Sequence, residues 1–259
     1  MTFSIIGTGN MAYFLAEELS AAGHKFIGIW GRNTLAANKI AIQYPTLVYS
    51  SLQDIKDEEE HYCFIAIKDT AIAEIAAQLN FKHTTLIHTA GASPLQLLGN
   101  QTKHTGIFWP IYSIVADNLK TIKDIPIAIQ GNNPQTENAI LDLAKSITDK
   151  AFIANEEQRT HLHLAAVFAN NFSNHLMAIA QEICIKQHLS FDYLKPIVEQ
   201  TFERLKTKPA KNLQTGPAIR DDKMTMQKHI DLLKSNPEWA LLYQSLSNSI
   251  RKMYSSSEE

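Results

Sequence analysis

The chain has 259 residues, of which 45% are hydrophobic and 19% charged, and its formal net charge is −2. This length predicts one or two domains, and the apolar fraction is enough to fill a core, which excludes a disordered or collagen-like chain. Because 24 basic residues face 26 acidic ones, there is no basic surplus of the kind that a dedicated nucleic-acid-binding protein uses to neutralise phosphates.

The first 153 residues alternate short apolar runs with helical patterns, which is typical of βαβ units. The predicted strands are 3–6, 26–30, 48–49, 62–67, 85–88, 126–130 and 151–153, and the predicted helices are 11–22, 34–44, 71–78 and 136–148. Phe108-Trp109-Pro110 is predicted to be a loop. The fold class that follows is α/β, with a doubly wound, mostly parallel sheet that is covered on both faces.

Strand signals stop beyond Asn155, and only helical patterns follow. They cover residues 156–188, 191–206, 222–233 and 237–254. We therefore predict a Rossmann-like, dinucleotide-binding α/β domain over 1–153 and an all-helical domain over 154–259.

Two cysteines, Cys63 and Cys184, lie in apolar stretches without any metal-ligand spacing. This usage excludes a disulfide scaffold and indicates buried thiols in a reducing compartment. The sequence shows neither a bilayer-spanning apolar run nor the charge and cleavage pattern of a signal peptide. We expect a cytoplasmic protein that does not contact membranes.

The segment from Gly7 to Ala12 reads G-T-G-N-M-A and joins the first predicted strand to the first predicted helix. In that setting the first glycine allows a tight turn, the second lets the backbone approach a pyrophosphate, and free N–H groups at the helix start bind the anion. We predict that a dinucleotide is bound here, by Gly7, Thr8, Gly9, Asn10 and Met11. A glycine-rich turn without a ligand is the alternative.

The second strand is followed by Gly31, Arg32 and Asn33, where an NAD site usually has an acidic residue. No acidic residue occurs between Glu18 and Asp54. A guanidinium at this position could pair with a 2′-phosphate, so Arg32 favours NADP(H) as the cofactor. A solvated surface arginine is the alternative for Arg32, and capping of the second helix is the alternative for Asn33.

Four segments together resemble the NADP-dependent reductases that include pyrroline-5-carboxylate reductase, ketopantoate reductase and deazaflavin-dependent NADP oxidoreductase: Ile5–Ala12, Gly31–Asn33, Ile65–Asp69 and His88–Ala92. Two later segments, His163–Phe172 and Thr215–Asp221, resemble a subgroup of bacterial NADP oxidoreductases. In that subgroup a Rossmann-like domain precedes a helical domain of unknown function. The resemblance covers nearly the whole chain and implies the fold and the cofactor, but not the substrate. One departure is that Arg-Gly-Asp in the subgroup reads Arg220-Asp221-Asp222 here.

Residues that follow the fourth and fifth strands should reach the sheet edge where the cofactor would lie. On this basis Ile67 and Lys68 are predicted to flank the ribose or nicotinamide, and His88 and Ala90 to lie beside the nicotinamide. A structurally hydrogen-bonded histidine is the alternative for His88. Trp109 could form an apolar wall of the substrate site, although core packing explains it equally well.

The helix from about residue 156 carries a dense polar set. At 100° per residue, His161, Leu164, Phe168, Asn171 and His175 form one stripe, and His163, Val167, Asn170 and Asn174 form a neighbouring one. The family resemblance implies a polar catalytic pair on this helix, with His163 and Asn171 as the candidates and Asn170 next. His163 would donate a proton as hydride is transferred. A hydrogen-bond network between helices is the alternative, and no metal site is expected.

Between two later helices, Thr215 opens a Gly-Pro break, and Arg220 follows it. An arginine near a cleft could bind a substrate carboxylate with two N–H groups, so Thr215 and Arg220 are predicted to bind substrate. Equally, Arg220 and Asp221 could orient the turn or pair across a dimer interface.

These patterns predict an NADP-dependent oxidoreductase that transfers hydride between NADP(H) and a small carbonyl or imine substrate, in a site between the two domains. The resemblance also implies a homodimer formed through the helical domain. The alternative is a non-catalytic NADP(H)-binding module that senses redox state and acts through a protein partner.

Overall fold

The computed structural model describes residues 1–100, 102–115 and 124–255. Its contacts divide the chain into two compact units, Met1–Val167 and Phe168–Glu259, called unit 1 and unit 2 below. The last strand ends at Ile153, where the sequence analysis placed the domain boundary, but the contacts divide the chain after Val167. The first helix beyond the sheet is therefore grouped with unit 1.

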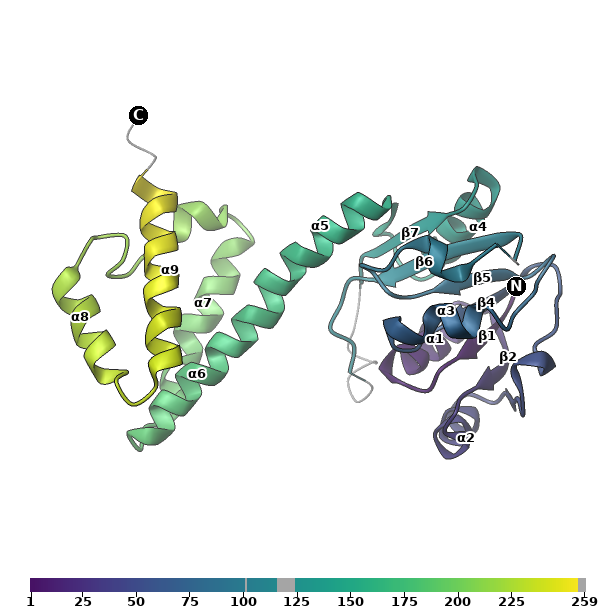
Figure 1. Ribbon diagram of the computed structural model, residues 1–259, viewed down its shortest axis with the longest axis horizontal. Coiled ribbons are helices and arrows are strands. Elements are labelled where there is room, and N and C mark those ends of the chain that lie inside the picture. Colours follow the sequence, from purple (N-terminus) through teal and green to yellow (C-terminus); the bar gives the residue numbers. More distant parts are fainter. Residues whose placement is uncertain (101, 116–123, 256–259) are drawn as a thin grey trace. The chain divides into compact units, whose positions relative to one another are not determined.

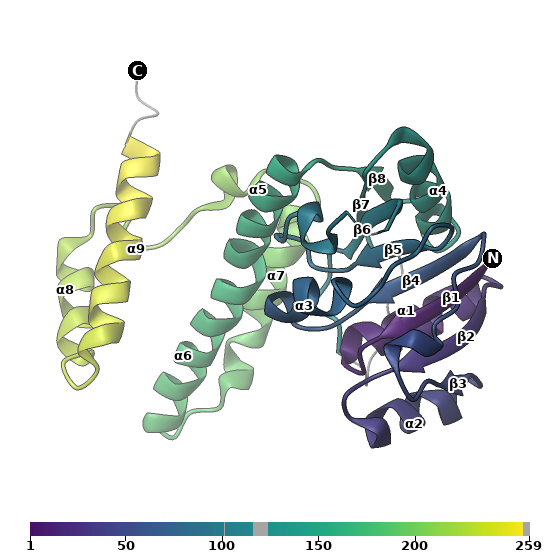
Figure 2. The same ribbon diagram turned by 45° about the vertical axis from the view of Figure 1, so that its right-hand side comes forward.

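Unit 1 is built on one eight-stranded sheet of order β3-β2-β1-β4-β5-β6-β7-β8, which can be followed in Figure 2. Every neighbouring pair of strands is parallel except β6–β7, which is antiparallel. The strands are β1 (Thr2–Ile6), β2 (Lys25–Trp30), β3 (Leu47–Val48), β4 (His61–Ile65), β5 (Thr85–His88), β6 (His104–Pro110), β7 (Ile127–Gly131) and β8 (Ala151–Ile153). The predicted Rossmann-like fold with a mostly parallel sheet is confirmed.

The prediction of a loop at Phe108-Trp109-Pro110 was wrong, because these residues end β6. They pair with Ile127–Ile129 of β7, and Phe108 is completely buried. Proline lacks a donor for the sheet ladder, but β5 pairs with β6 only as far as Ile107, so at Pro110 the strand has a neighbour on one side only. Pairing with a segment about twenty residues away thus outweighs the local loop signal.

Helices cover both faces of the sheet because alternate strand residues point to opposite sides. One face packs on α1 (Asn10–Ala21), α2 (Thr34–Gln43) and α4 (Pro134–Lys145), with Phe3 and Phe64 among its strand residues. The other face packs on α3 (Ile72–Ala76) and short 3₁₀ helices at Leu52–Asp54, Asp69–Ala71 and Leu95–Leu98. On that second face, Trp109 belongs to a cluster that includes Leu162 of α5 (Glu156–Ala166).

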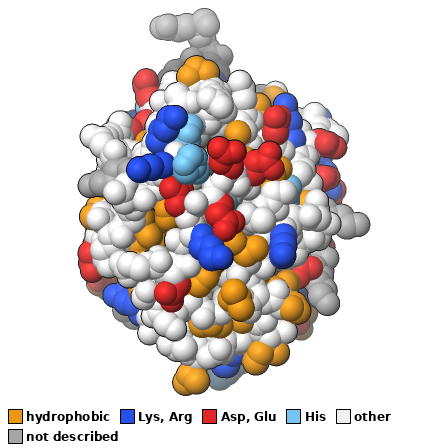
Figure 3. Space-filling model, turned by 90° about the vertical axis from the view of Figure 1, so that its right-hand side faces the viewer, with side chains coloured by type: hydrophobic (Ala, Val, Ile, Leu, Met, Phe, Trp, Pro, Cys, Tyr) orange, Lys and Arg blue, Asp and Glu red, His pale blue; other side chains and the backbone are white. Residues whose placement is uncertain are grey.

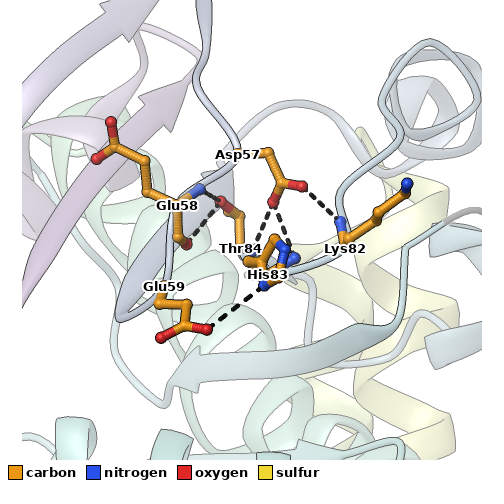
Figure 4. Close-up of polar contacts among 6 residues, drawn as sticks. All are labelled: Asp57, Glu58, Glu59, Lys82, His83 and Thr84. Carbon is orange, nitrogen blue, oxygen red and sulfur yellow. Dashed lines mark hydrogen bonds and ion pairs between the residues drawn. The ribbon is translucent and has the colours of Figure 1, made fainter.

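A single carboxylate fixes the starts of β4 and β5 relative to each other (Figure 4). Asp57, in the loop before β4, accepts backbone N–H groups of Lys82, His83 and Thr84 at 2.8, 2.9 and 2.8 Å. Although desolvation alone would raise the pKa of Asp57, these donors lower it below the ordinary aspartate value. The loops before two central strands are therefore anchored to each other.

Buried His61, the first residue of β4, joins two side chains of β1. Its ring nitrogens lie 2.8 Å from Thr2 Oγ1 and 3.0 Å from Ser4 Oγ. Desolvation lowers the pKa of His61 to about 4. The core of unit 1 therefore contains a neutral imidazole at ordinary pH.

Unit 2 is helical. After a π-helical turn (Val167–Phe172) come α6 (Ser173–Lys186), α7 (Lys195–Leu205), α8 (Lys223–Leu232) and α9 (Pro237–Ser255). Figures 1 and 2 show α8 beside α9, and Lys186 of α6 lies over the Trp239 ring of α9, 4.6 Å from its centroid. Among the described residues no helix is both long and apolar enough to cross a membrane.

Candidate functional site

The glycine loop between β1 and α1 has the geometry of an anion cradle. Gly7 has φ +126°, and a Cβ there would lie 2.1 Å from the carbonyl oxygen of Ala66, so only glycine fits. Gly9 has ordinary backbone angles, and a Cβ built on it meets no atom within 4 Å. The first glycine is therefore needed by the fold, whereas the second leaves open space beside the start of α1.

The start of α1 differs from the starts of the other long helices of unit 1. Asn33, Asn133 and Asn155 cap α2, α4 and α5 with side-chain hydrogen bonds. In contrast, α1 has Gly9 at its N-cap position, so it has no side-chain cap, and its first turn has no acidic residue. Its first N–H groups and the positive end of its dipole are thus available to an anion.

A cavity of about 540 Å³ opens at this helix start, within the size range of small-molecule sites. It lies at the carboxyl ends of β1, β2 and β4, where ligands bind open α/β sheets. All of the predicted cofactor residues line it except His88 and Ala90; those that do are Gly7, Thr8, Gly9, Asn10, Met11, Gly31, Arg32, Asn33, Ile67 and Lys68.

The side chains of this set are engaged to different degrees. Asn10 Nδ2 donates to the carbonyl of Ile114 at 3.0 Å, which ties the segment after β6 to the glycine loop. Asn33 Oδ1 accepts Ala36 N–H at 3.1 Å, so its side chain caps α2, as the alternative stated. Exposed Arg32 has no hydrogen bond or ion pair with any described residue. Its guanidinium is available to a ligand in the cavity.

Both ring nitrogens of His88 have partners within the protein. Nδ1 accepts the Ala90 N–H at 3.2 Å, and Nε2 lies 3.3 Å from the carbonyl oxygen of Pro94. The residue is completely buried, and desolvation lowers its pKa to about 4. The structural alternative therefore describes the His88 side chain better than a contact with cofactor. Ala90 is partly buried and packs against the second core cluster.

Trp109 and His163, both predicted site residues, lie against each other in unit 1. Their ring centroids are 5.9 Å apart at an interplanar angle of 43°. Trp109 is 8% exposed, and a Cβ on Gly91 would lie 2.3 Å from its indole ring. Glycine at position 91 thus lets the loop after β5 approach the indole, while His163 stays exposed on α5.

A π-helical turn covers Val167–Phe172 and contains Asn170 and Asn171. A π turn holds more residues than an α turn, so the predicted stripes at 100° per residue hold only as far as the end of α5. Both asparagines are exposed. Such turns occur frequently at functional sites.

Thr215 and Arg220 are exposed in the segment between α7 and α8. Asp221 follows with φ +49°, in the region that glycine favours, which accounts for a glycine at this place in the resembled pattern. The Asp221 carboxylate accepts Arg251 Nη1 at 2.9 Å and lies 3.6 Å from Lys223 Nζ. Asp221 therefore orients the turn, which was one of the alternatives given for Arg220 and Asp221.

A larger cavity, of about 740 Å³, lies at the other end of the sheet, where the strands begin. Acidic and basic residues both line it, among them Glu59, Glu60, Lys82, Lys103 and His104, and the face in Figure 3 shows such mixed charges. Because ligands bind α/β sheets at the carboxyl ends of strands, we assign the site to the smaller cavity.

Several residues of the site were not predicted from the sequence. Glu74 and Ile75 of α3 line the cavity, as do Trp30 and Thr89. The positions of Trp30 and Thr89 could have indicated them, because Trp30 is the last residue of a predicted strand and Thr89 is the first residue after one. Arg159, a fully buried arginine on α5 that does not line the cavity, was not predicted either, and the sequence holds no local signal for it.

The fold and this glycine loop define a Rossmann-like nucleotide-binding protein. Residues 2–91 match the family described as NADP oxidoreductase, coenzyme F420-dependent, and residues 125–250 match a domain of unknown function. A comparison with curated sequences gave no significant match.

Solved structures give further matches. A proposed NADP oxidoreductase from Bacteroides fragilis is 30% identical, with a TM-score of 0.88 over 97% of this chain and 98% of that one. A pyrroline-5-carboxylate reductase from Streptococcus pyogenes is 18% identical, with a TM-score of 0.64 over 97% and 98%. An imine reductase from Myxococcus stipitatus in complex with NADP⁺ is 14% identical, with a TM-score of 0.62 over 99% and 95%.

The chain belongs to the NADP oxidoreductase family in which an N-terminal domain of this type precedes the domain of unknown function. The predicted resemblance is thus confirmed. The two remote reductases support the fold alone.

Proposed function

We propose that the chain binds NADP(H) in the 540 Å³ cavity and transfers hydride between this cofactor and a small carbonyl or imine substrate. The observation that carries the proposal is the meeting of three features in one cavity: the uncapped start of α1, the open space at Gly9, and the unengaged guanidinium of Arg32. Two remotely similar structures, a pyrroline-5-carboxylate reductase and an imine reductase, are enzymes whose names refer to imine chemistry. They support a C=N or C=O substrate for this proposal.

The residues of the cavity fit the parts of this cofactor. Amide groups at Asn10 and Met11 would bind the pyrophosphate, which the missing side chain of Gly9 admits. Arg32 would pair with the 2′-phosphate. When bound, the cofactor supplies the hydride; the protein orients it and provides a proton.

We assign the proton donor to His163. Its ring is exposed and held by contact with Trp109, which would also give the substrate an apolar wall. Imidazole can donate a proton near neutral pH to the oxygen or nitrogen that gains charge as hydride arrives. Asn170 and Asn171 remain predictions as catalytic residues, and Thr215 and Arg220 remain predictions as substrate-binding residues.

The cofactor assignment is tested by titrating NADPH and NADH into wild-type protein and Arg32→Ala, following cofactor fluorescence. One arginine–phosphate pair contributes about 1.5–3 kcal/mol, so the variant should bind NADPH about 10- to 100-fold more weakly. Its NADH affinity should stay unchanged. Equal affinity of the wild type for both nucleotides would contradict the assignment of NADP(H).

Catalysis is tested with a panel of small imines and carbonyl compounds and NADPH as reductant. His163→Ala should lose turnover by about 100-fold or more and keep the NADPH affinity of the wild type. A protein that binds NADPH, reduces no member of the panel and changes its partner or oligomeric state between NADP⁺ and NADPH would instead be the redox-sensing module.

We further propose that unit 2 forms a homodimer. Of its described side chains only Cys184, Ala218 and Met226 are buried. Large apolar side chains remain exposed on α7, including Ile197, Phe202 and Leu205, and an apolar surface of this extent marks an association surface. A second copy would cover these side chains.

A further inference from the structure

Arg159, on the first turn of α5, is the largest fully buried side chain among the described residues. Its Nη1 donates to Gln130 Oε1 at 2.9 Å, and its Nη2 donates to the backbone oxygen of Ser93 at 3.3 Å. Its Nε has no hydrogen-bond partner. No ion pair among the described residues includes Arg159.

A contribution to the folding stability of the protein does not explain a guanidinium in this environment. Desolvation disfavours the charged form, and it lowers the pKa of Arg159. Replacing buried charged groups by well-packed apolar side chains of similar volume often leaves the stability of the folded protein unchanged or raises it. What an apolar side chain could not do here is donate two hydrogen bonds in fixed directions to two different segments.

The backbone acceptor belongs to the loop that leaves the sheet at the edge where the cavity lies, and the side-chain acceptor is level with the end of β5, because Gln130 pairs with Ile107 and Ile107 pairs with His88. Gln130 is on β7, and Ser93 is in the loop after β5. That loop also supplies Thr89 to the wall of the cavity. The donor on α5 therefore joins this loop to the sheet.

A second hydrogen bond extends the connection to the loop after β4. Ser93 Oγ donates to Asp69 Oδ2 at 2.9 Å. Asp69 directly follows Ile67 and Lys68, which line the cavity, and precedes Ala71, which also lines it. A continuous series of hydrogen bonds thus runs from Arg159 through Ser93 and Asp69 to both loops that wall the cavity.

We propose that Arg159 is a positioning residue for the cofactor: through Ser93 and Asp69 it holds the loops after β4 and β5 in the shape that binds NADPH. The inference rests on the proposed function. It makes the start of α5 part of the cofactor site, although its guanidinium does not touch the cavity.

The test uses the full-length protein, with NADPH affinity measured by energy transfer from tryptophan and the Tm measured in parallel. Arg159→Met keeps an unbranched apolar chain but removes the charge and both hydrogen bonds. We expect it to bind NADPH at least about 10-fold more weakly, because small misplacements of binding groups have large effects. Its Tm should stay close to that of the wild type, because the loss of a desolvated cation offsets the two acceptors that are left without their donor.

Two further variants follow the same route. Arg159→Lys keeps a charge but has no planar fork, so its affinity should lie between those of wild type and Arg159→Met. Ser93→Ala removes the hydroxyl that reaches Asp69 and leaves the backbone acceptor of Arg159 in place. It should weaken NADPH binding by about threefold to tenfold, with little change in Tm. Arg204→Met, at an exposed arginine of α7, is the matched control and should bind as the wild type does.

Wild-type affinity in Arg159→Met, or in Ser93→Ala, would overturn the inference. So would a weaker affinity that comes with a lower Tm in Arg159→Met, because Arg159 would then be a stabilising residue only. A wild type that binds no NADPH would contradict the proposed function as well, so the two failures can be told apart.

Discussion

The two units of this chain differ in how much apolar surface each buries by itself. In unit 1, helices on both faces of the sheet bury a nearly continuous set of strand residues, many of them completely. In unit 2, the described helices leave most large apolar side chains exposed. Since burial of apolar surface is the dominant favourable term in folding, unit 1 has a core of its own, whereas unit 2 lacks one of comparable size.

This difference also separates two kinds of site residue. The cofactor cavity is made by strand ends and helix starts that the core of unit 1 fixes, so its shape is set before a ligand arrives. The predicted residues Asn170, Asn171, Thr215 and Arg220 belong to the unit with few buried contacts. Segments with few buried apolar contacts are typically the less stable and more dynamic parts of a protein.

The largest expected effect concerns association through unit 2. The double variant Ile197→Glu/Phe202→Glu places charges on the exposed apolar face of α7 and should abolish the dimer, as measured by sedimentation. Ile42→Glu is the control, since Ile42 is 82% exposed on α2 of unit 1. If the wild-type protein sediments as a monomer at high concentration, the proposed homodimer is contradicted.

Next come the two glycines of the loop, which should separate folding from binding. Gly9→Ala adds a methyl group to open space, so its Tm should not change, but NADPH binding should weaken by about 100-fold. Gly7→Ala forces a strained φ and a clash with Ala66, and should lower the free energy of unfolding by about 3 kcal/mol or more. Melting curves and titrations measure both. Wild-type affinity in Gly9→Ala would contradict the assigned site.

A smaller effect is expected from pH. His61 and His88 have pKa values lowered to about 4 in the folded protein and an ordinary pKa of about 6.5 when unfolded. The unfolded chain therefore binds more protons between these values, so the free energy of unfolding should fall as the pH drops from about 6.5 toward 4. Denaturant titrations at several pH values measure this slope, and His61→Gln should reduce it. An unchanged slope in that variant would show that His61 is not responsible.

The smallest effect is expected at Asp221. Asp221→Gly relieves the left-handed backbone but loses the contacts to Arg251 and Lys223. Because exposed ion pairs contribute about 0–1 kcal/mol and the backbone gain is of similar size, the net change in stability should stay within about 1 kcal/mol. Asp221→Ala, which keeps the strain and loses the contacts, should be the less stable of the two. The reverse order would contradict this account.

The sequence alone determined the parts of the protein that rest on local patterns. Alternating apolar runs and helical periods predicted the order of strands and helices along the chain, and the placement of G-x-G-x-x-A between strand and helix predicted the loop at the cavity. Arg32 could be found because it lies two residues after the end of a predicted strand, and parallel strands bring their ends to one edge.

Only the tertiary structure decided the features that join distant segments. Residues 108–110 became a strand because β7 pairs with them, Arg159 became buried because β7 and the loop after β5 supply its acceptors, and His88 found its partners inside the protein. A local pattern records what neighbouring residues favour, whereas these contacts depend on groups 6 to 66 positions apart in the chain. These contacts exist because packing of the complete sheet brings such groups together.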